Sequence, residues 1–354
     1  MTSPDRARLT IDLDALAHNY AVLEDAAAGA EVAAVVKADG YGLGAGPVCR
    51  RLWAEGCRSF FVARVSEGED LRAAMGDRAA AIYVLDGLLP GVAGRLTAAG
   101  LTPVLNTAAQ VAAADGYEGP VAVQIDSGMN RQGLTPAEAA ALAPELARLD
   151  IALVMSHLGS ATDPAEGRNP EQLARFAPAA ALIPGRPISL AASAGAFLGA
   201  DYRFDMIRAG VSLFGGGPEE RPDARLRAVA TLTAPILDIR RLQPGDRVGY
   251  GASFTAARPM QVAVVAAGYA DGVIRAAMGR GYAWAASARR PLLAVNMDLL
   301  VIELGDGEAT VGEHVELLGA NVALDDLAQA AGTVAHEILV RLSPRAERVY
   351  LGEG

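Results

Sequence analysis

One stretch decides the fold: Glu31-Val-Ala-Ala-Val-Val-Lys37, followed directly by Ala38-Asp-Gly-Tyr41-Gly-Leu-Gly44. Its first half is an apolar run of strand length, and its second half is a glycine-rich turn. An open, doubly wound sheet that binds dinucleotides has Gly-x-Gly-x-x-Gly at this turn, and Lys37 and Tyr41 interrupt that pattern here. The stretch therefore argues against the open sheet and places a primary amine at the end of the first strand.

Eight short runs of β-forming residues alternate with alanine-rich stretches of helical character up to residue 208. They occupy residues 32–37, 59–63, 81–85, 102–105, 121–126, 151–157, 188–192 and 205–208. Eight strand–helix units predict a closed (β/α)8 TIM barrel of the α/β class over residues 10–225.

A glycine- and proline-rich segment at residues 215–222 marks a domain boundary. Beyond it, short alternating strands separated by turns predict a mostly β domain over residues 226–354, to which we add residues 1–9. The run at residues 8–12 fits either unit, and Asp12 or Asp14 is expected to cap a helix over residues 15–24.

Composition excludes several functional classes. The chain has 354 residues, a formal net charge of -10 and no block of Lys or Arg, so nucleic acid is not an expected partner. Cys49 and Cys57 are the only cysteines and form neither a zinc set nor a disulfide framework, which fits a reducing cytoplasm and no metal site. Without an apolar signal core or a long uncharged run, we expect neither export nor a membrane span.

Lys37 stands at a position suited to covalent chemistry with a carbonyl cofactor. An amine fixed at a strand end can form an imine, and desolvation or a nearby cation lowers its pKa from about 10.4 and frees the lone pair. Taken alone, the same segment also fits a lysine that extends from a strand end into water.

Other polar residues also fall at strand ends, where the reacting groups of such a barrel gather. They are Asp126 with Arg131, His157, Ser193, and the run Arg208-Ala-Gly210-Val211. Ser193 and Gly210 are expected to cradle a phosphate, because small residues let backbone N–H groups approach an anion. Each residue singly has an ordinary structural explanation: Ser193 as an N-cap, Gly210 as a turn, His157 as a satisfied histidine, and Arg208 as a salt-bridge partner.

With these motifs, the chain resembles bacterial alanine racemases. The resemblance covers nearly the whole sequence through six motifs in order: Val35-Val-Lys37-Ala-Asp-Gly-Tyr41, Asp126-Ser-Gly-Met-Asn-Arg131, Arg208-Ala-Gly-Val-Ser, Val248-Gly-Tyr250-Gly-Ala, Gly268-Tyr-Ala-Asp-Gly272 and Met297-Asp298. It implies a barrel plus a β domain, pyridoxal 5'-phosphate bound to Lys37, and a head-to-tail homodimer that interconverts L- and D-alanine and so supplies D-alanine for peptidoglycan.

The resemblance also implies a role for each matching residue. Lys37 serves as the base for the D enantiomer, and Tyr250 of the partner subunit serves as the base for the L enantiomer. Arg131 and the partner's Met297 N–H hold the substrate carboxylate. The remaining cofactor-binding positions are Tyr41 at the phosphate, Arg208 at the ring nitrogen, and His157, Ser193, Gly210 and Val211; Tyr269 and Arg275 match residues of the entrance.

The sequence departs from the family pattern at three places. Gln124 stands where many members have a carbamylated lysine, so we expect Arg131 to be oriented by a direct hydrogen bond that it donates to the Gln124 amide, or by a bound chloride. Ala192-Ser193 replaces an Asn-Ser pair, and a late tyrosine is replaced near Pro344. Both changes lie at positions that bind the cofactor phosphate in the family, so we expect them to lower the affinity for the cofactor.

Three alternative functions share part of this pattern. A non-catalytic pyridoxal-phosphate carrier would lack the second domain, and a decarboxylase of basic amino acids would be longer and would need a cysteine there. A racemase of another small amino acid, such as serine, stays open, because one methylene or hydroxyl changes specificity only about 10- to 200-fold.

Overall fold

The computed structural model describes residues 6–353, so residues 1–5 and 354 of the predicted second domain lie outside it. The chain forms two compact units, Ala17–Leu213 and the described parts of Met1–Leu16 and Phe214–Gly354. These limits differ from the predicted barrel, residues 10–225, at both ends. β1 (Arg8–Asp12) pairs with strands of the second sheet, and Gly217 N donates to Asp325 of the second unit (2.8 Å).

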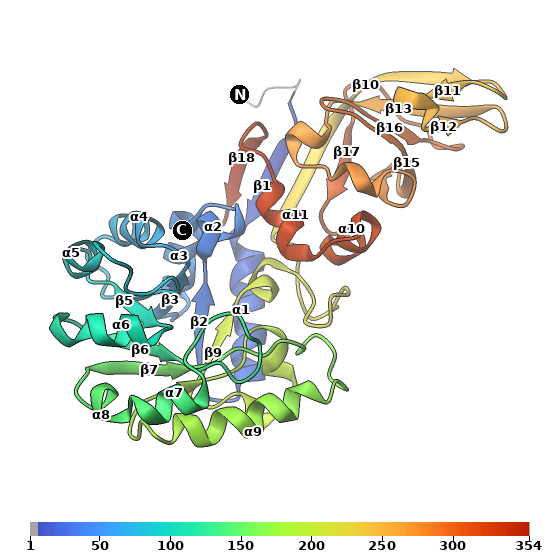
Figure 1. The fold of residues 1–354 in the computed structure, drawn as a ribbon. Helices are drawn as coiled ribbons and strands as arrows, with labels where there is room; N and C mark the ends of the chain where they lie inside the picture. Colours follow the sequence, from blue (N-terminus) through green and yellow to red (C-terminus); the bar gives the residue numbers. More distant parts are fainter. Residues whose placement is uncertain (1–5, 354) are drawn as a thin grey trace. The chain divides into compact units, whose positions relative to one another are not determined.

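The first unit is the predicted (β/α)8 barrel, which is confirmed (Figure 1). Its strands follow the order β8-β7-β6-β5-β4-β3-β2-β9, and every neighbouring pair is parallel. The bridge Ala192↔Arg208 and the bond from Arg208 N to Ala191 O (3.0 Å) connect the last strand to the chain after β8, which closes the ring. The strands are β2 (Glu31–Val35), β3 (Ser59–Val62), β4 (Ala81–Val84), β5 (Thr102–Leu105), β6 (Val121–Gln124), β7 (Ile151–Met155), β8 (Ile188–Ser189) and β9 (Met206–Ala209).

Helices connect these strands. They are α1 (Leu13–Ala27), which begins in the second unit, α2 (Lys37–Tyr41), α3 (Ala45–Ala54), α4 (Val65–Met75), α5 (Ala93–Ala98), α6 (Ala108–Ala113), α7 (Pro136–Ala141), α8 (Ala143–Leu146) and α9 (Arg168–Ala180). Asp12 Oδ1 accepts from Ala15 N (2.8 Å), so of the two predicted capping residues this one caps α1.

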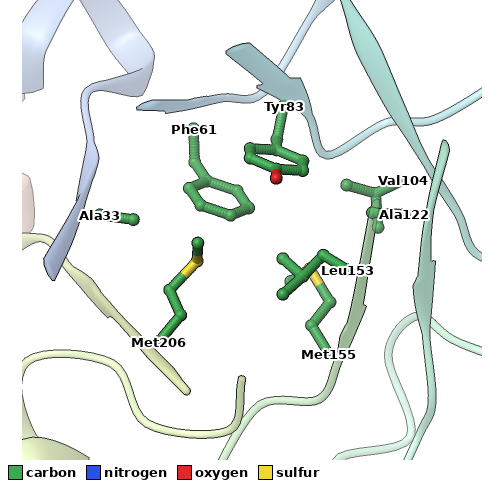
Figure 2. Close-up of a cluster of buried hydrophobic side chains, with 8 residues drawn as sticks. All are labelled: Ala33, Phe61, Tyr83, Val104, Ala122, Leu153, Met155 and Met206. Carbon is green, nitrogen blue, oxygen red and sulfur yellow. The ribbon is translucent and has the colours of Figure 1, made fainter. Parts of the chain in front are cut away.

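A core of alternating inward side chains fills the centre of the barrel (Figure 2). The Phe61 and Tyr83 rings stack with their centroids 4.5 Å apart, and Met155 and Met206 are buried with them. Since successive strand residues point to opposite faces, one residue in two faces this core. The packed centre leaves the strand ends as the place for polar groups.

The second unit is built on a mostly antiparallel sheet, as predicted, with β18 (Glu347–Leu351) parallel to β1 at one edge. The long strand β10 (Ala230–Leu242) pairs with β1, β13 and β17 and has an irregularity between Ile236 and Asp238. The other strands are β13 (Met260–Val265), β14 (Tyr282–Ala285), β15 (Ala288–Val295), β16 (Leu300–Glu303) and β17 (His314–Leu318), with the small ribbon β11 (Arg247–Val248) and β12 (Phe254–Thr255) and the helices α10 (Leu324–Ala331) and α11 (Ala335–Arg341).

Candidate active site

Lys37 lies just beyond the end of β2, at the start of a turn of left-handed helix. It is the only lysine in the sequence. The φ angles of Ala38, Asp39, Gly40 and Tyr41 are 54°, 56°, 63° and 56°. Left-handed backbone costs a non-glycine residue about 1–2 kcal/mol, so the surrounding contacts must hold this turn in place.

Hydrogen bonds inside and outside the turn brace it. Gly40 N donates to Val36 O (2.8 Å), and Gly42 N donates to Ala38 O (2.7 Å). From α4, the Glu67 carboxylate accepts from Ala38 N (3.0 Å) and from the backbone before its own helix. The residue that follows Lys37 is therefore anchored to a neighbouring βα unit.

The environment of Lys37 favours its neutral amine. Burial lowers the pKa of Lys37 below its usual value, and the nearby Arg131 guanidinium lowers it further, whereas Glu67 and Asp86 oppose the shift. An amine with a lowered pKa has a free lone pair at lower pH and is a better nucleophile and base.

Tyr41 brings this turn against the end of β9. The Tyr41 ring is buried, and a Cβ added at Gly210 would lie 2.5 Å from its hydroxyl oxygen, so only glycine fits there. Burial raises the pKa of Tyr41, which keeps the phenol protonated and able to donate a hydrogen bond.

Hydrogen-bond donors gather at residues 210–212. Ser193 Oγ accepts from Gly210 N (2.9 Å) and Ser212 N (3.3 Å), so the Ser193 hydroxyl does not cap the helical turn that it precedes. The Ser212 hydroxyl is buried without a hydrogen-bond partner, and Val211 is buried between the two amides. The Ser193 and Ser212 hydroxyls and the Tyr41 phenol form a donor set that fits a phosphate group, because the Gly210 and Ser212 amides already donate to Ser193 Oγ.

Arg208 is a buried cation held by neutral acceptors. Its guanidinium donates to Ser189 Oγ (2.6 Å) and Ser156 O (2.5 Å), and it lies 3.3 Å from His157 Nδ1. Burial lowers the pKa of Arg208 to about 10, so it stays protonated at neutral pH. No carboxylate pairs with it among residues 6–353, so the salt-bridge interpretation is wrong. An arginine can only donate, which fits a ring nitrogen that accepts.

Gln124 does not hydrogen-bond Arg131 directly, which corrects one of the two predicted arrangements. The buried Gln124 amide instead donates to Gln132 O (3.0 Å), because the loop folds back over the end of β6. Asp126 Oδ1 accepts three successive amides of the same loop, at residues 128, 129 and 130. The loop is held rigidly on both sides of Arg131.

Arg131 faces a pocket of about 360 Å³ at the ends of β4, β5 and β6. Asp86, Asp126 and Asn106 also line this pocket, Lys37 does not, and the buried Asn106 Oδ1 has no hydrogen-bond partner. A guanidinium with open space beside it can receive a carboxylate.

The second unit carries the remaining predicted residues, Tyr250 and Met297. Tyr250 begins the turn η5 (Tyr250–Ala252) and is 83% exposed, and Met297 is 54% exposed. Gly249 permits the turn, because an added Cβ would lie 2.6 Å from Ser253 Oγ. The Met297 N–H donates to no group in the described part of the chain, which leaves it free for a ligand.

Sequence reasoning missed several residues that position the site. Ser189 lies under Arg208, Ser212 adds an unpaired hydroxyl, and Glu67 holds the Lys37 turn. Gln172 of α9 accepts from Gly159 N (2.7 Å) and donates to His157 O (3.0 Å). Only Glu67 had a sequence signal, since it stands three residues after Arg64, the residue that precedes its helix.

Residues 6–353 contain neither a metal-binding cluster nor a membrane-spanning helix. Across residues 6–353, no cluster of three or more His, Cys, Asp or Glu could hold a metal ion. In the same range, no helix has the length and apolar character needed to cross a membrane.

Known proteins share both units of the chain. Residues 11–218 match the family "Alanine racemase, N-terminal domain", and residues 229–350 match "Alanine racemase, C-terminal domain". The chain is 44% identical to an alanine racemase of Methylobacterium sp. (strain 4-46), with 99% of each chain covered. It is 41% identical to a catabolic alanine racemase of Agrobacterium fabrum, covering 98% of this chain and 92% of the relative.

A solved structure agrees with these matches. The alanine racemase of Bartonella henselae, determined with covalently bound pyridoxal phosphate, superposes with a TM-score of 0.91 at 32% identity over 98% of this chain and 99% of the other. From its sequence, its fold and the arrangement of its strand-end residues, the chain belongs to the alanine racemase family.

Proposed function

We propose that this protein interconverts L-alanine and D-alanine with pyridoxal 5'-phosphate as cofactor. The observation that carries the proposal is the single lysine of the chain, partly buried and with a lowered pKa, on a braced turn whose Tyr41 meets Gly210. The amine and the hydroxyl donors both follow the carboxyl ends of barrel strands, which supports a carbonyl cofactor that carries a phosphate. Family membership supports the activity.

The barrel residues would hold the cofactor as follows. Lys37 binds it covalently, and Tyr41, Ser193, Gly210, Val211 and the Ser212 hydroxyl surround its phosphate. Arg208, fixed by Ser189 and Ser156 and close to His157, donates to its ring nitrogen. When bound, pyridoxal phosphate withdraws electrons from the substrate Cα–H bond.

Inversion at Cα requires a proton to leave one face and another to arrive at the opposite face, so two bases are needed. The Lys37 amine, released when the substrate amine takes its place on the cofactor, would take or return the proton on the face used by D-alanine. Tyr250 of the partner subunit serves the face used by L-alanine. Its 83% exposure on an isolated chain supports a position that a second copy covers.

The substrate carboxylate is bound by two donors. Arg131 offers a guanidinium at an open pocket, and the partner's Met297 offers an unpaired backbone N–H. Both contacts are made equally well before and during proton transfer, so they set affinity and orientation.

Location and cellular role are parts of the same proposal. D-alanine is a component of peptidoglycan, and the supply of that precursor is the general role of the family. Cys49 and Cys57 are both free and buried, which is consistent with a reducing cytoplasm. We infer a cytoplasmic homodimer whose two active sites are shared between subunits.

The first test identifies the cofactor-bound residue and the substrate. Borohydride reduction of the purified yellow protein, followed by peptide mapping, should label Lys37, whose only competitor is the N-terminal amine. Single enantiomers of alanine and serine incubated in deuterated water then report which Cα exchanges and inverts. A label without turnover would favour a carrier, and faster inversion of serine would favour a serine racemase.

A variant tests the assignment of the second base. Tyr250→Phe should lose L-to-D conversion while it still exchanges the Cα proton of D-alanine, because Lys37 remains. Tyr117→Phe, which removes a hydroxyl that donates to Leu101 O (2.9 Å), is the matched control and should keep both directions. Equal retention of both directions in Tyr250→Phe would remove Tyr250 from the mechanism.

A further inference from the structure

Two loops of the second unit, residues 268–272 and 296–299, are joined along their backbones. Tyr269 N donates to Asn296 O (2.9 Å), and Ala270 N donates to Met297 O (3.0 Å). The loops are so close that a Cβ added at Gly268 would lie 2.2 Å from Asn296 O. The direction of the Met297 N–H therefore depends on the position of both loops.

Arg345 touches a carboxylate from each loop. Its Nη1 lies 2.5 Å from Asp298 Oδ1, directly after Met297, and its Nε lies 3.3 Å from Asp271 Oδ1. Asp271 is buried, and its other oxygen accepts from Gly268 N (2.9 Å). Burial raises the pKa of Asp271, whereas the Gly268 amide and the Arg345 cation act in the opposite direction and favour the carboxylate.

We propose that Arg345 is a positioning residue that holds the Met297 N–H in place for the carboxylate of the amino-acid substrate, acting through Asp298 and Asp271. The inference rests on the proposed function, because it concerns the same substrate. Arg345 does not touch the substrate itself. It adds a side-chain connection between residues 268–272 and 296–299, beside the backbone hydrogen bonds that join them.

Loss of Arg345 should change the loops more than it changes the fold. The Arg345 side chain is half exposed, and the Asp298 pair is more than half exposed, so these contacts contribute little to global stability. The buried Asp271 carboxylate, however, would lose the one cation that pairs with it among residues 6–353 and keep the Gly268 amide, which favours a shift of residues 268–272. A positioning role therefore predicts a local change at residues 268–272 with little change in global stability, whereas a purely structural role predicts a loss of global stability.

The experiment compares Arg345→Gln with Arg345→Lys and with Arg258→Gln in the full-length holoenzyme. Arg258 is the matched control, because it pairs with Glu303 in the same unit and is similarly exposed. For Arg345→Gln we expect the KM for alanine to rise about tenfold, with kcat within about threefold of wild type, because the Met297 contact binds ground and transition states alike. Arg345→Lys should restore part of the affinity, and Arg258→Gln should behave as wild type.

Two readouts do not depend on turnover. Propionate has the carboxylate and carbon chain of alanine without the amine, so its inhibition constant should rise in Arg345→Gln by the same factor as KM. The amide hydrogens of Tyr269 and Ala270 should exchange faster in Arg345→Gln and unchanged in Arg258→Gln. If Arg345→Gln does not fold, Asp298→Asn removes only the exposed pair and should give a smaller rise of the same kind.

The outcomes are distinct. If wild type does not invert alanine, the proposed function fails and the inference falls with it. If wild type inverts alanine while Arg345→Gln keeps its KM, its propionate inhibition and its amide exchange, the inference fails and the function stands. A loss of kcat alone, without a change in propionate binding, would also overturn the positioning role.

Discussion

At the scale of single residues, the site depends on side chains whose ordinary properties are changed by burial. Lys37 has its pKa lowered, Arg208 is a cation without a carboxylate, and Tyr41 is held protonated. Residue type alone indicated which of them matter. Their protonation and ion pairing depend on the groups around them, and only the tertiary structure shows which groups those are.

The lowered pKa of Lys37 predicts unusual reactivity in the cofactor-free protein. At any pH below 10.5 a larger fraction of this amine is neutral than for an ordinary lysine, so its acylation rate should reach half of its maximum below pH 10.5. Because the chain has no other lysine, mass spectrometry of the intact protein can follow the reaction after correction for the N-terminus. Arg131→Gln should move the midpoint upward, and a wild-type midpoint at or above 10.5 would contradict the prediction.

Gly210 and Tyr41 provide a pair of compensating substitutions. Gly210→Ala places a methyl group 2.5 Å from the Tyr41 hydroxyl, so we expect a loss of about 1–3 kcal/mol in unfolding free energy from overpacking. Tyr41→Phe removes that oxygen, and the double variant should recover most of the loss in denaturant unfolding. If the double variant instead lost as much unfolding free energy as the two single variants together, the methyl group of Gly210→Ala would not be in conflict with the Tyr41 hydroxyl. Cofactor affinity should stay low in both Tyr41→Phe variants.

At the scale of elements, the strand positions followed from local pattern and the connections between elements did not. Seven predicted strands agree with the structure to within about two residues, a normal uncertainty in element boundaries. The run 188–192 contains only the two-residue strand β8; after it, Ala191 O accepts from Arg208 N (3.0 Å) and Ser193 Oγ accepts from Gly210 N (2.9 Å). The left-handed turn after Lys37 was predicted only as a glycine-rich turn, since three of its residues are not glycine.

The bond between α4 and this turn can be tested with two neighbouring glutamates. Glu67→Ala leaves the amides of Ala38 and Ala63 without their acceptor, so unfolding free energy should fall by about 1–3 kcal/mol, and cofactor affinity should fall too. Glu69→Ala, on the same helix, removes only a surface pair with Arg95 and should have little effect. Denaturant unfolding and cofactor titration measure both, and equal effects of the two substitutions would contradict the role of Glu67.

At the scale of the whole molecule, the proposed homodimer makes a quantitative prediction. Mixed dimers of Lys37→Ala and Tyr250→Phe chains contain one intact site, because the two residues come from different subunits. Random mixing of equal amounts should restore about one quarter of wild-type activity, as expected for a symmetric dimer.

The matched control is a mixture of Lys37→Ala with Arg131→Ala. Both residues belong to the same barrel, so every site in that mixed dimer keeps a defect, and the mixture should show no activity above that of the two variants measured separately. No recovery in the first mixture, with mixed dimers present by native mass spectrometry, would exclude shared sites.

The sequence by itself determined the closed barrel, the β domain and the amine that carries the chemistry, because strand and helix periodicity and residue type are local properties of the chain. Only the tertiary structure decided that Ser189 supports Arg208, that the Gln124 amide holds Gln132, and that Arg345 joins two loops. From the sequence alone, each of these residues has several possible hydrogen-bond partners. Folding of the barrel and of the second sheet brings one partner of each residue within hydrogen-bond distance, because it joins distant parts of the chain.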